Sequence, residues 1–168
     1  MHYNFKKDLV IGEEGEEVII QDLISMGAEY DSNNKTNSHD VIVSFKGKKI
    51  AYECKTDFFD DTGNMFIETS CRGKDSGISV TSADWFVTYF KKLNEIWYIK
   101  TDRLKEILKN HQHTIATQIG DEGSNTEGVL LNKNMFRDEF IVRHSIKHIE
   151  IIKKWQKKYQ KKQNLKLN

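Results

Sequence analysis

The sequence predicts an α/β fold with a mixed sheet, and three observations lead to this class. A helical pattern of apolar residues opens the chain, short β-rich runs fill its middle, and further helical patterns follow those runs. The order helix, three strands, helix, two strands, helix is typical of α/β proteins. With 168 residues, 38% of them hydrophobic, the chain has enough apolar side chains for one modest core.

The composition excludes several classes of protein. The chain has no proline and only 10 glycines, which excludes collagens and low-complexity linkers. No uncharged apolar run approaches ~18 residues and the first residues lack a signal-peptide core, so we expect no membrane contact. Cys54 and Cys71 are too few for a disulfide framework, and we expect them to be reduced, non-nucleophilic thiols of a cytoplasmic protein.

The first predicted helix covers residues 8–26. Its start is open between Asp8 and Glu13, because Gly12 and Gly15 weaken the first turns. Gly27 is expected to end it as a C′ glycine. Apolar side chains recur along one side at spacings of three and four, at Val10, Ile11, Ile19, Ile20, Leu23, Ile24 and Met26.

A β-hairpin is predicted next, formed by residues 40–45 and 48–55 around the turn Lys46-Gly47. Residues 64–71 are predicted as a third strand, and residues 79–84 as a short helical segment.

The middle of the sheet is assigned to two aromatic-rich runs, residues 85–90 and 96–99, whose Trp and Tyr side chains we expect in the core. Thr101-Asp102 is expected to cap a helix that reaches about Asn110. Further along, residues 120–128 are predicted as a polar loop and residues 139–143 as an edge strand.

The C-terminal segment is a separate, basic feature. Residues 145–168 hold eight lysines and one glutamate, a net charge of +7, whereas the chain as a whole carries +1. An apolar stripe from Ile149 to Tyr159 predicts a helix whose first half docks on the body. We therefore divide the chain into a domain of residues 1–144 and a basic helix of residues 145–168, packed on that domain or extending from it. This helix either contacts phosphates or is simply solvated.

The register of the hairpin follows from its turn. With Lys46-Gly47 as a two-residue turn, Val43 faces Ile50 and Val41 faces Tyr52, which gives one apolar face. A register slipped by one residue would mix apolar and charged side chains on the same face, so it is disfavoured.

The same register places charged groups together on the other face. Asp40 falls opposite Glu53, Lys55 lies one pleat further along, and Cys54 points to the apolar side. Two carboxylates so close repel each other, and a hard divalent cation removes that conflict. A metal-bound water and a lysine ammonium are the parts needed to hydrolyse a phosphodiester.

These residues resemble the signature of the PD-(D/E)xK nuclease superfamily, an Asp that opens one strand and Glu-x-Lys in the next. Here they are Asp40 and Glu53-Cys54-Lys55. The resemblance covers roughly residues 12–90, includes the region of residues 76–87, and departs from the pattern in having His39 before Asp40. It implies a restriction-endonuclease-like core of helix, three-strand meander, helix and strand.

The resemblance also implies roles for individual residues. Asp40, Glu53 and the backbone carbonyl of Cys54 would bind Mg²⁺ or Mn²⁺, and Lys55 would be catalytic. Many members carry a Glu on the first helix; Glu16 is our choice because it precedes Ile19 and Ile20 on the inward stripe, with Glu13 and Glu17 as alternatives.

The implied activity is a metal-dependent endonuclease that cleaves DNA, duplex or branched, in the cytoplasm of a bacterium or phage-infected host. A homodimer is expected, because many relatives cut two strands with two sites. A Holliday-junction resolvase, a homing endonuclease and a catalytically idle DNA-binding protein on the same fold are the alternatives. The sequence does not determine the shape of the substrate, and it does not distinguish DNA from RNA as the substrate. Residues 91–128 match no specific pattern of the family.

Other charged residues have weaker assignments. Candidate phosphate contacts are Arg72, Lys74, Lys153, Lys154 and Lys157, with a solvated surface as the alternative. Glu68 and Asp57 are assigned by default to local loop order, although Glu68 lies where it can approach the site from the third strand. A zinc site at His111/His113 or His144/His148 is disfavoured because no third ligand is evident.

Overall fold

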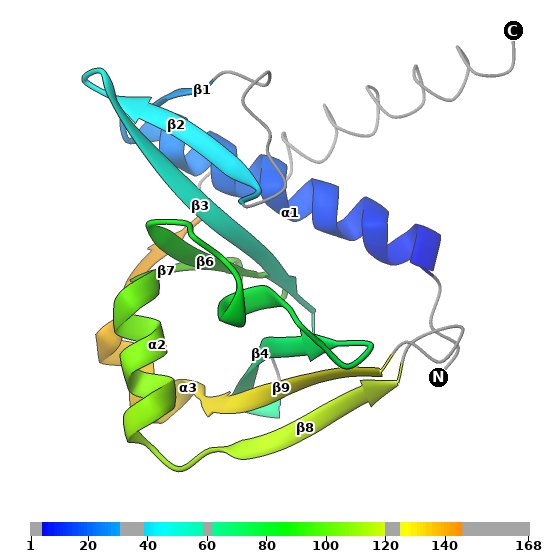
Figure 1. Ribbon diagram of the computed structural model, residues 1–168. Coiled ribbons are helices and arrows are strands. Elements are labelled where there is room, and N and C mark those ends of the chain that lie inside the picture. Colours follow the sequence, from blue (N-terminus) through cyan, green and yellow to red (C-terminus); the bar gives the residue numbers. More distant parts are fainter. Residues whose placement is uncertain (1–4, 31–38, 59–61, 120–124, 146–168) are drawn as a thin grey trace, which may run out of the picture.

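The computed structural model describes residues 5–30, 39–58, 62–119 and 125–145. Two sheets and one long helix dominate the fold (Figure 1). The first sheet has six strands, with β3 and β6 parallel and the other neighbours antiparallel, and the second has four antiparallel strands. This mixed six-stranded sheet confirms the predicted α/β class.

In the six-stranded sheet the order is β1 (Glu29–Tyr30), β2 (Val41–Phe45), β3 (Lys48–Asp57), β6 (Trp85–Phe90), β7 (Glu95–Lys100) and β10 (Ile141–His144). In the four-stranded sheet the order is β5 (Lys74–Asp75), β4 (Asn64–Cys71), β9 (Asn125–Asn132) and β8 (Thr114–Ile119). The helices are α1 (Phe5–Ser25), α2 (Thr101–Asn110) and α3 (Lys133–Phe136), with short 3-10 turns η3 (Gly77–Ser79) and η5 (Arg137–Glu139).

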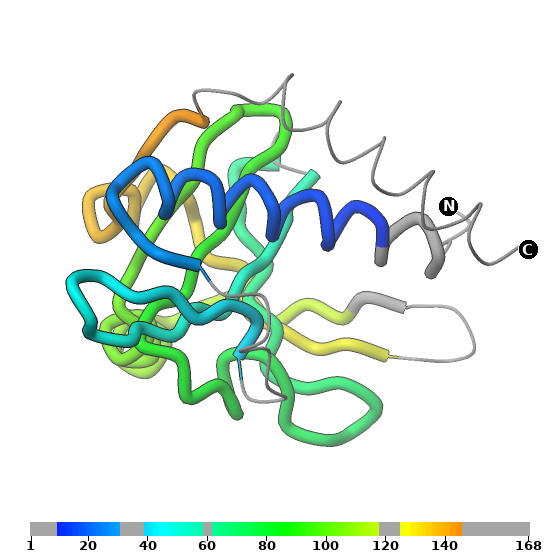
Figure 2. The backbone as a smooth tube through the Cα atoms, turned by 90° about the horizontal axis from the view of Figure 1, so that it is seen from above, coloured from blue at the N-terminus to red at the C-terminus, as the bar shows by residue number. Residues whose placement is uncertain are grey.

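The six-stranded sheet separates two apolar cores. Helix α1 runs along one face of this sheet (Figure 2), and its Val18, Ile19 and Leu23 pack with Tyr52 and Cys54 of β3. The opposite face packs against β4, α2 and α3, with Phe86 and Phe90 of β6 in the centre. Because side chains alternate along a strand, neighbouring residues of β6 such as Phe86 and Val87 enter different cores.

Helix α1 buries Ile19, Ile20 and Leu23 of the predicted stripe, but Ile24 and Met26 of that stripe are exposed, so the prediction is wrong for these two. The helix stops where the sequence indicates. Gly27 has φ +93°, the left-handed conformation of a C′ glycine, and the N–H of Ala28 donates to the Leu23 carbonyl at 3.1 Å. The helix begins at Phe5 and passes without a break through Gly12 and Gly15, so it starts earlier than the predicted range.

Three predicted elements differ from the structure. β4 pairs with β9 in the second sheet, so the described part of the chain does not join it to the β2–β3 hairpin as a meander. Of the helical segment predicted over residues 79–84, only Ser79 is helical, as the last residue of η3. Residues 80–84 are not helical. Residues 125–132 form β9 although a polar loop was predicted over residues 120–128, because β9 pairs with β4, far away in the sequence. Residues 114–119 form β8, which pairs with β9.

Smaller details follow the prediction more closely. β6, β7 and α2 match their predicted ranges within a residue or so, and β10 is an edge strand. Lys100 rather than Thr101 takes the N-cap position of α2, without a side-chain cap. Both cysteines are free thiols, and Cys54 is buried.

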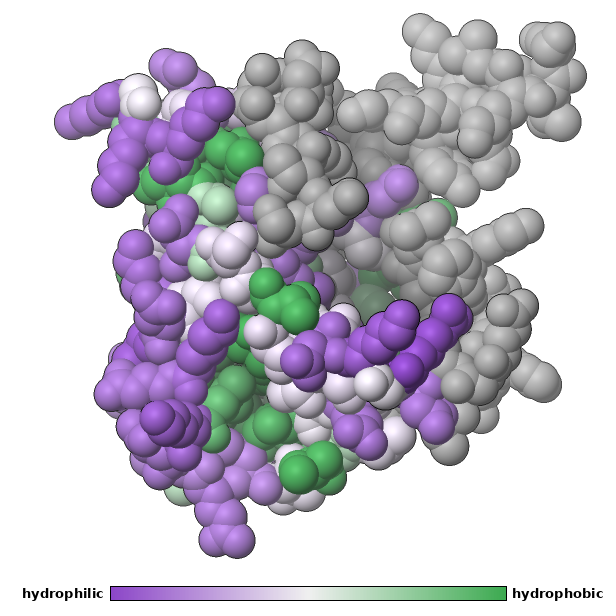
Figure 3. Space-filling view, in the orientation of Figure 1, coloured by the Kyte–Doolittle hydropathy of each residue, from purple (hydrophilic) through white to green (hydrophobic). Residues whose placement is uncertain are grey.

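On the face shown in Figure 3, the described residues are largely hydrophilic, with hydrophobic side chains showing in patches between them. Within the described residues no helix is long and apolar enough to cross a membrane. The predicted C-terminal helix, including Lys153, Lys154 and Lys157, lies outside the described residues apart from Ser145.

Candidate active site

The β2–β3 hairpin has the predicted register. Val41 pairs with Tyr52 and Val43 with Ile50, and the turn residues Lys46 and Gly47 have φ of 49° and 80°. Both positive values are those of a type I′ turn, which matches the twist of the two strands. The register therefore confirms that Tyr52 and Cys54 face α1, and it puts Glu53 and Lys55 on the other side of β3.

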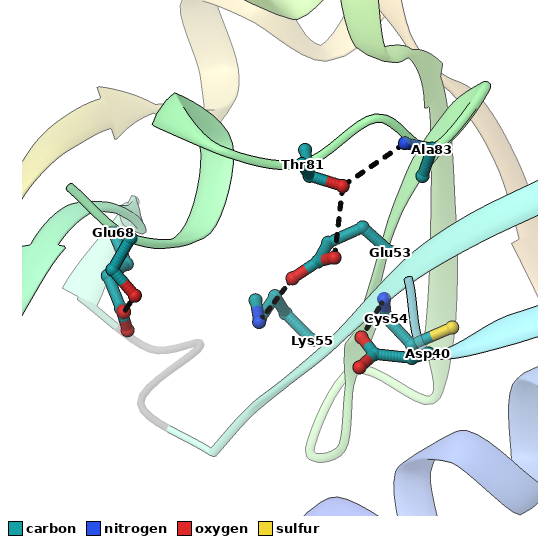
Figure 4. Close-up of polar contacts among 8 residues, drawn as sticks. Asp40, Glu53, Cys54, Lys55, Glu68, Thr81 and Ala83 are labelled. Carbon is teal, nitrogen blue, oxygen red and sulfur yellow. Dashed lines mark hydrogen bonds and ion pairs between the residues drawn. The ribbon is translucent and has the colours of Figure 1, made fainter. Parts of the chain in front are cut away.

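Asp40 departs from the simple register. Its N–H donates to the Tyr52 carbonyl at 3.1 Å, so the backbone leaves the ladder one residue before Val41. Its carboxylate accepts the backbone N–H of Cys54 at 2.8 Å, and Figure 4 shows it against Cys54 while Glu53 points elsewhere. The predicted face-to-face pair of Asp40 and Glu53 is thus replaced by two carboxylates that are each held by their own donors.

Glu53 is the most constrained carboxylate of the site. It is 8% exposed. One oxygen lies 2.7 Å from Nζ of Lys55, and the other accepts the hydroxyl of Thr81 at 3.1 Å (Figure 4). Donors on both oxygens fix the plane of the carboxylate, while each oxygen keeps a further lone pair for another ligand.

Lys55 remains positively charged in this environment. Burial alone would lower the pKa of its ammonium, but attraction to Glu53, the hydrogen bond with Glu53, and the charges of Asp40 and Glu68 raise that pKa above its ordinary value. The site therefore presents a stable cation beside Glu53 at neutral pH.

Cys54 is not a nucleophile here. Burial, together with the negative charges of Asp40, Glu16 and Glu53, raises the pKa of its thiol well above the ordinary value, while Lys55 has a weaker, opposite effect. A thiol of this kind stays protonated at neutral pH and is inert.

Glu16 lies on α1, the helix that packs on the Cys54 side of β3, and its charge contributes to the raised pKa of the Cys54 thiol. Among the neighbouring glutamates, Glu14 pairs with Lys91 at 2.8 Å, and Glu17 accepts from Gln21 at 3.0 Å. Glu16 stays our choice for the helix carboxylate as a prediction, with Glu13 and Glu17 as the alternatives.

Gly15 sets the distance between α1 and β3. A Cβ built on Gly15 would lie 1.7 Å from the hydroxyl oxygen of Thr56 and 2.9 Å from its Cβ. Only a residue without a side chain permits this approach, which brings Glu16 up to the strand that carries Glu53 and Lys55.

This packing predicts opposite effects for two glycines of the same helix. Gly15→Ala is expected to lower the free energy of unfolding by about 1–3 kcal/mol through overpacking against Thr56. A Cβ on Gly12 meets nothing within 4 Å, so Gly12→Ala is expected to raise stability by up to about 1 kcal/mol through helix propensity. Urea denaturation measures both, and equal effects of the two substitutions would contradict the assigned packing.

Glu68 approaches the site from β4. Its charge contributes to the raised pKa of Lys55, and its carboxylate accepts the hydroxyl of Ser76 (Figure 4). Gly77, with φ +54°, lies against the Glu68 backbone, where a Cβ would come within 2.5 Å of the carbonyl oxygen. The contacts of Glu68 with Ser76 and Gly77 therefore order the turn after β4. The same carboxylate also acts on the charge of Lys55.

Thr81 is a site residue that the sequence did not reveal. It lies 28 positions from Glu53, and no local pattern connects the two. The one sequence signal for Thr81 was that it lies within residues 76–87, a region included in the family resemblance.

Hard oxygen donors of the kind that Mg²⁺ prefers are present in Asp40, Glu53 and the Cys54 carbonyl. Within the described ranges, no three side chains of Asp, Glu, His or Cys form a group that could hold a metal ion. A metal at these oxygens would need water or phosphate to supply its other ligands, and its binding stays a prediction.

The remaining predicted contacts lie apart from this centre. Arg72 and Lys74 are exposed around the β4–β5 turn, where Arg72 has φ 53°. His111 and His113 pack against the ring of Phe136, with centroids 5.0 and 5.8 Å away.

No protein-family model and no curated protein matches this chain. Among solved structures, the chain is similar to a bacterial homing endonuclease, I-Ssp6803I, with 16% sequence identity and a TM-score of 0.46. The similarity covers 55% of this chain and 68% of that chain. A likeness at this level does not establish an activity, so the functional proposal depends on the residues of the site.

Proposed function

We propose that this protein is a metal-dependent endonuclease that hydrolyses phosphodiester bonds of DNA. The observation that carries the proposal is the carboxylate of Glu53, held by Lys55 at 2.7 Å and Thr81 at 3.1 Å, together with the carboxylate of Asp40, which accepts the N–H of Cys54, the next residue of β3. A surface ion cluster would not need a buried hydroxyl donor on a carboxylate that is 8% exposed.

In this proposal Asp40, Glu53 and the Cys54 carbonyl hold Mg²⁺ or Mn²⁺, and Glu16 contributes a further carboxylate. The ion, when bound, polarises the phosphate and acidifies a water molecule. The ammonium of Lys55 offsets the negative charge that develops on the phosphate oxygens. Asp40 keeps its orientation because the Cys54 N–H fixes one of its oxygens.

DNA, duplex or branched, is the proposed partner, and a homodimer would place two sites on two strands. Arg72 and Lys74 are proposed phosphate contacts because they are exposed and lie just past the strand that carries Glu68. Lys153, Lys154 and Lys157 are proposed to add sequence-independent affinity by counterion release. Resolvase and homing endonuclease remain narrower forms of the same proposal.

The test compares substrates of matched length, a four-way junction, a duplex, a single strand and an RNA, with Mg²⁺ and with EDTA. We expect cleavage of at least one DNA substrate with Mg²⁺ and none with EDTA. Calorimetry with Mn²⁺ is the parallel measurement. Tight DNA binding without metal binding or cleavage would instead favour a catalytically idle DNA-binding protein.

A further inference from the structure

Residues 80–84, which connect η3 to β6, are fastened to β3 beside the candidate site. Asp84 forms two bonds with Ala51: its N–H donates to the Ala51 carbonyl at 2.9 Å, and its carboxylate accepts the Ala51 N–H at 2.9 Å. At the other end, the N–H of Thr81 donates to the Gly77 carbonyl at 3.0 Å. The connection is therefore tied down on both sides of Thr81.

The hydroxyl of Thr81 has a defined direction. It accepts the N–H of Ala83 at 3.2 Å and lies 3.1 Å from Oε2 of Glu53, the carboxylate oxygen that does not contact Lys55 (Figure 4). The Ala83 N–H can only donate and an ionised carboxylate can only accept, so the one hydroxyl proton is directed to Glu53. Thr81 is 5% exposed, which leaves water little access to take its place.

A third contact ties this residue to α2. The ammonium of Lys105 donates to the backbone carbonyl of Thr81 at 3.1 Å. Thr81 is thus bonded through its N–H, its carbonyl and its hydroxyl to three parts of the fold. Its position is determined by η3, α2 and the N–H of Ala83 together, and the position of the Glu53 carboxylate follows from it.

We propose that Thr81 is a positioning residue for the metal-binding carboxylate of Glu53, an inference that rests on the proposed function. Lys55 alone, 38% exposed at its side chain, would leave the carboxylate free to turn and bind the ammonium with both oxygens. The Thr81 hydroxyl holds the second oxygen away from Lys55. Glu53 therefore keeps one orientation in which both oxygens still have lone pairs for a cation.

The experiment compares Thr81→Val, which keeps the shape and removes the donor, with Thr81→Ser, which restores the donor. Outer contacts that orient a metal ligand are worth about 10–100-fold in metal affinity or activity. We expect Thr81→Val to lower kcat and the Mn²⁺ affinity measured by calorimetry about 10-fold each, with KM for DNA unchanged. Thr81→Ser is expected to return both within about 3-fold of the original.

Thr101→Val is the matched control. Thr101 is also buried, and within the described residues its hydroxyl has no hydrogen-bond partner. The same substitution there removes no bond, so kcat and Mn²⁺ affinity should not change. Thermal unfolding checks that each variant is folded, and Thr81→Ala replaces Thr81→Val if the valine is not accommodated.

The outcomes separate the two proposals. If Thr81→Val matches the original protein in kcat and Mn²⁺ affinity while Lys55→Ala is inactive, the positioning role is wrong and the nuclease proposal stands. If Thr81→Ser remains as weak as Thr81→Val, the hydroxyl is not the determinant and the inference is also wrong. If the unaltered protein neither binds Mn²⁺ nor cleaves DNA, both proposals are lost.

Discussion

Lys55→Ala is expected to lower the rate of Mg²⁺-dependent DNA cleavage by about 10²–10³-fold, the usual effect of removing one donor that stabilises developing charge. The ammonium lies 2.7 Å from Glu53, on the face of β3 that is turned away from α1. Its removal takes away the positive charge next to the proposed phosphate position. Initial rates on the best DNA substrate, at saturating Mg²⁺, measure the effect.

The pH behaviour of Lys55 follows from the direction of its pKa. Burial opposes the charge, but Glu53, Asp40 and Glu68 together raise the pKa above its ordinary value. Because the folded pKa exceeds the unfolded value of about 10.4, the charged lysine favours folding below about pH 10, and this contribution is lost as the pH rises through the folded pKa. Cleavage should therefore not decline near neutral pH through loss of the Lys55 proton.

Lys49→Ala is the matched control for Lys55→Ala. Lys49 is an exposed lysine on the same face of the same strand, six residues before Lys55 and next to the hairpin turn. Its removal should leave kcat unchanged. If Asp40→Ala and Lys55→Ala both cleave as fast as the original protein with Mg²⁺, the assignment of this centre is wrong.

The hairpin was predictable because its information is local. Alternation of apolar residues and a Lys-Gly turn determine which residues face each other, and Glu53 and Lys55 share a face simply by being two residues apart. The deviation at Asp40 was not predictable in this way. It depends on a side-chain bond to the Cys54 N–H, at the point where the ladder ends.

The second sheet and the contact from Thr81 depend on long-range pairing. β4 looks like a third strand of a meander from its own sequence, but its partner β9 begins more than 50 residues later. Gly128 in β9 has space only for a hydrogen, since a Cβ would come within 2.5 Å of the Ile67 carbonyl oxygen and of the Phe66 ring. A glycine that serves a close strand approach is indistinguishable in sequence from a loop glycine.

A buried ion cluster around Asp22 connects α1 with the far edge of the six-stranded sheet. Its carboxylate accepts the hydroxyl of Tyr98 at 2.8 Å and the guanidinium of Arg143 at 2.7 and 3.1 Å. Burial and the neighbouring carboxylate raise the pKa of the Tyr98 hydroxyl, and the bond to Asp22 raises the pKa of Arg143. Both donors therefore keep their protons over the whole ordinary pH range.

Asp22→Ala is expected to lower the free energy of unfolding by about 3–5 kcal/mol, because it leaves a partly buried guanidinium and a buried hydroxyl without their acceptor. Tyr98→Phe removes one bond only and should cost less, about 1.5–3 kcal/mol. Urea denaturation measures both.

The comparison with Glu139 separates burial from ion pairing as the cause. Glu139 also accepts two bonds from one arginine, Arg103, at 2.9 and 2.7 Å, but this pair is exposed. Water can replace Arg103 as a partner of Glu139, whereas the side chain of Asp22 is only 4% exposed. Glu139→Ala should therefore change stability far less than Asp22→Ala. If both variants lost the same free energy of unfolding, burial would not set the strength of the Asp22 cluster. The contact between α1 and β10 would then depend on something other than this carboxylate.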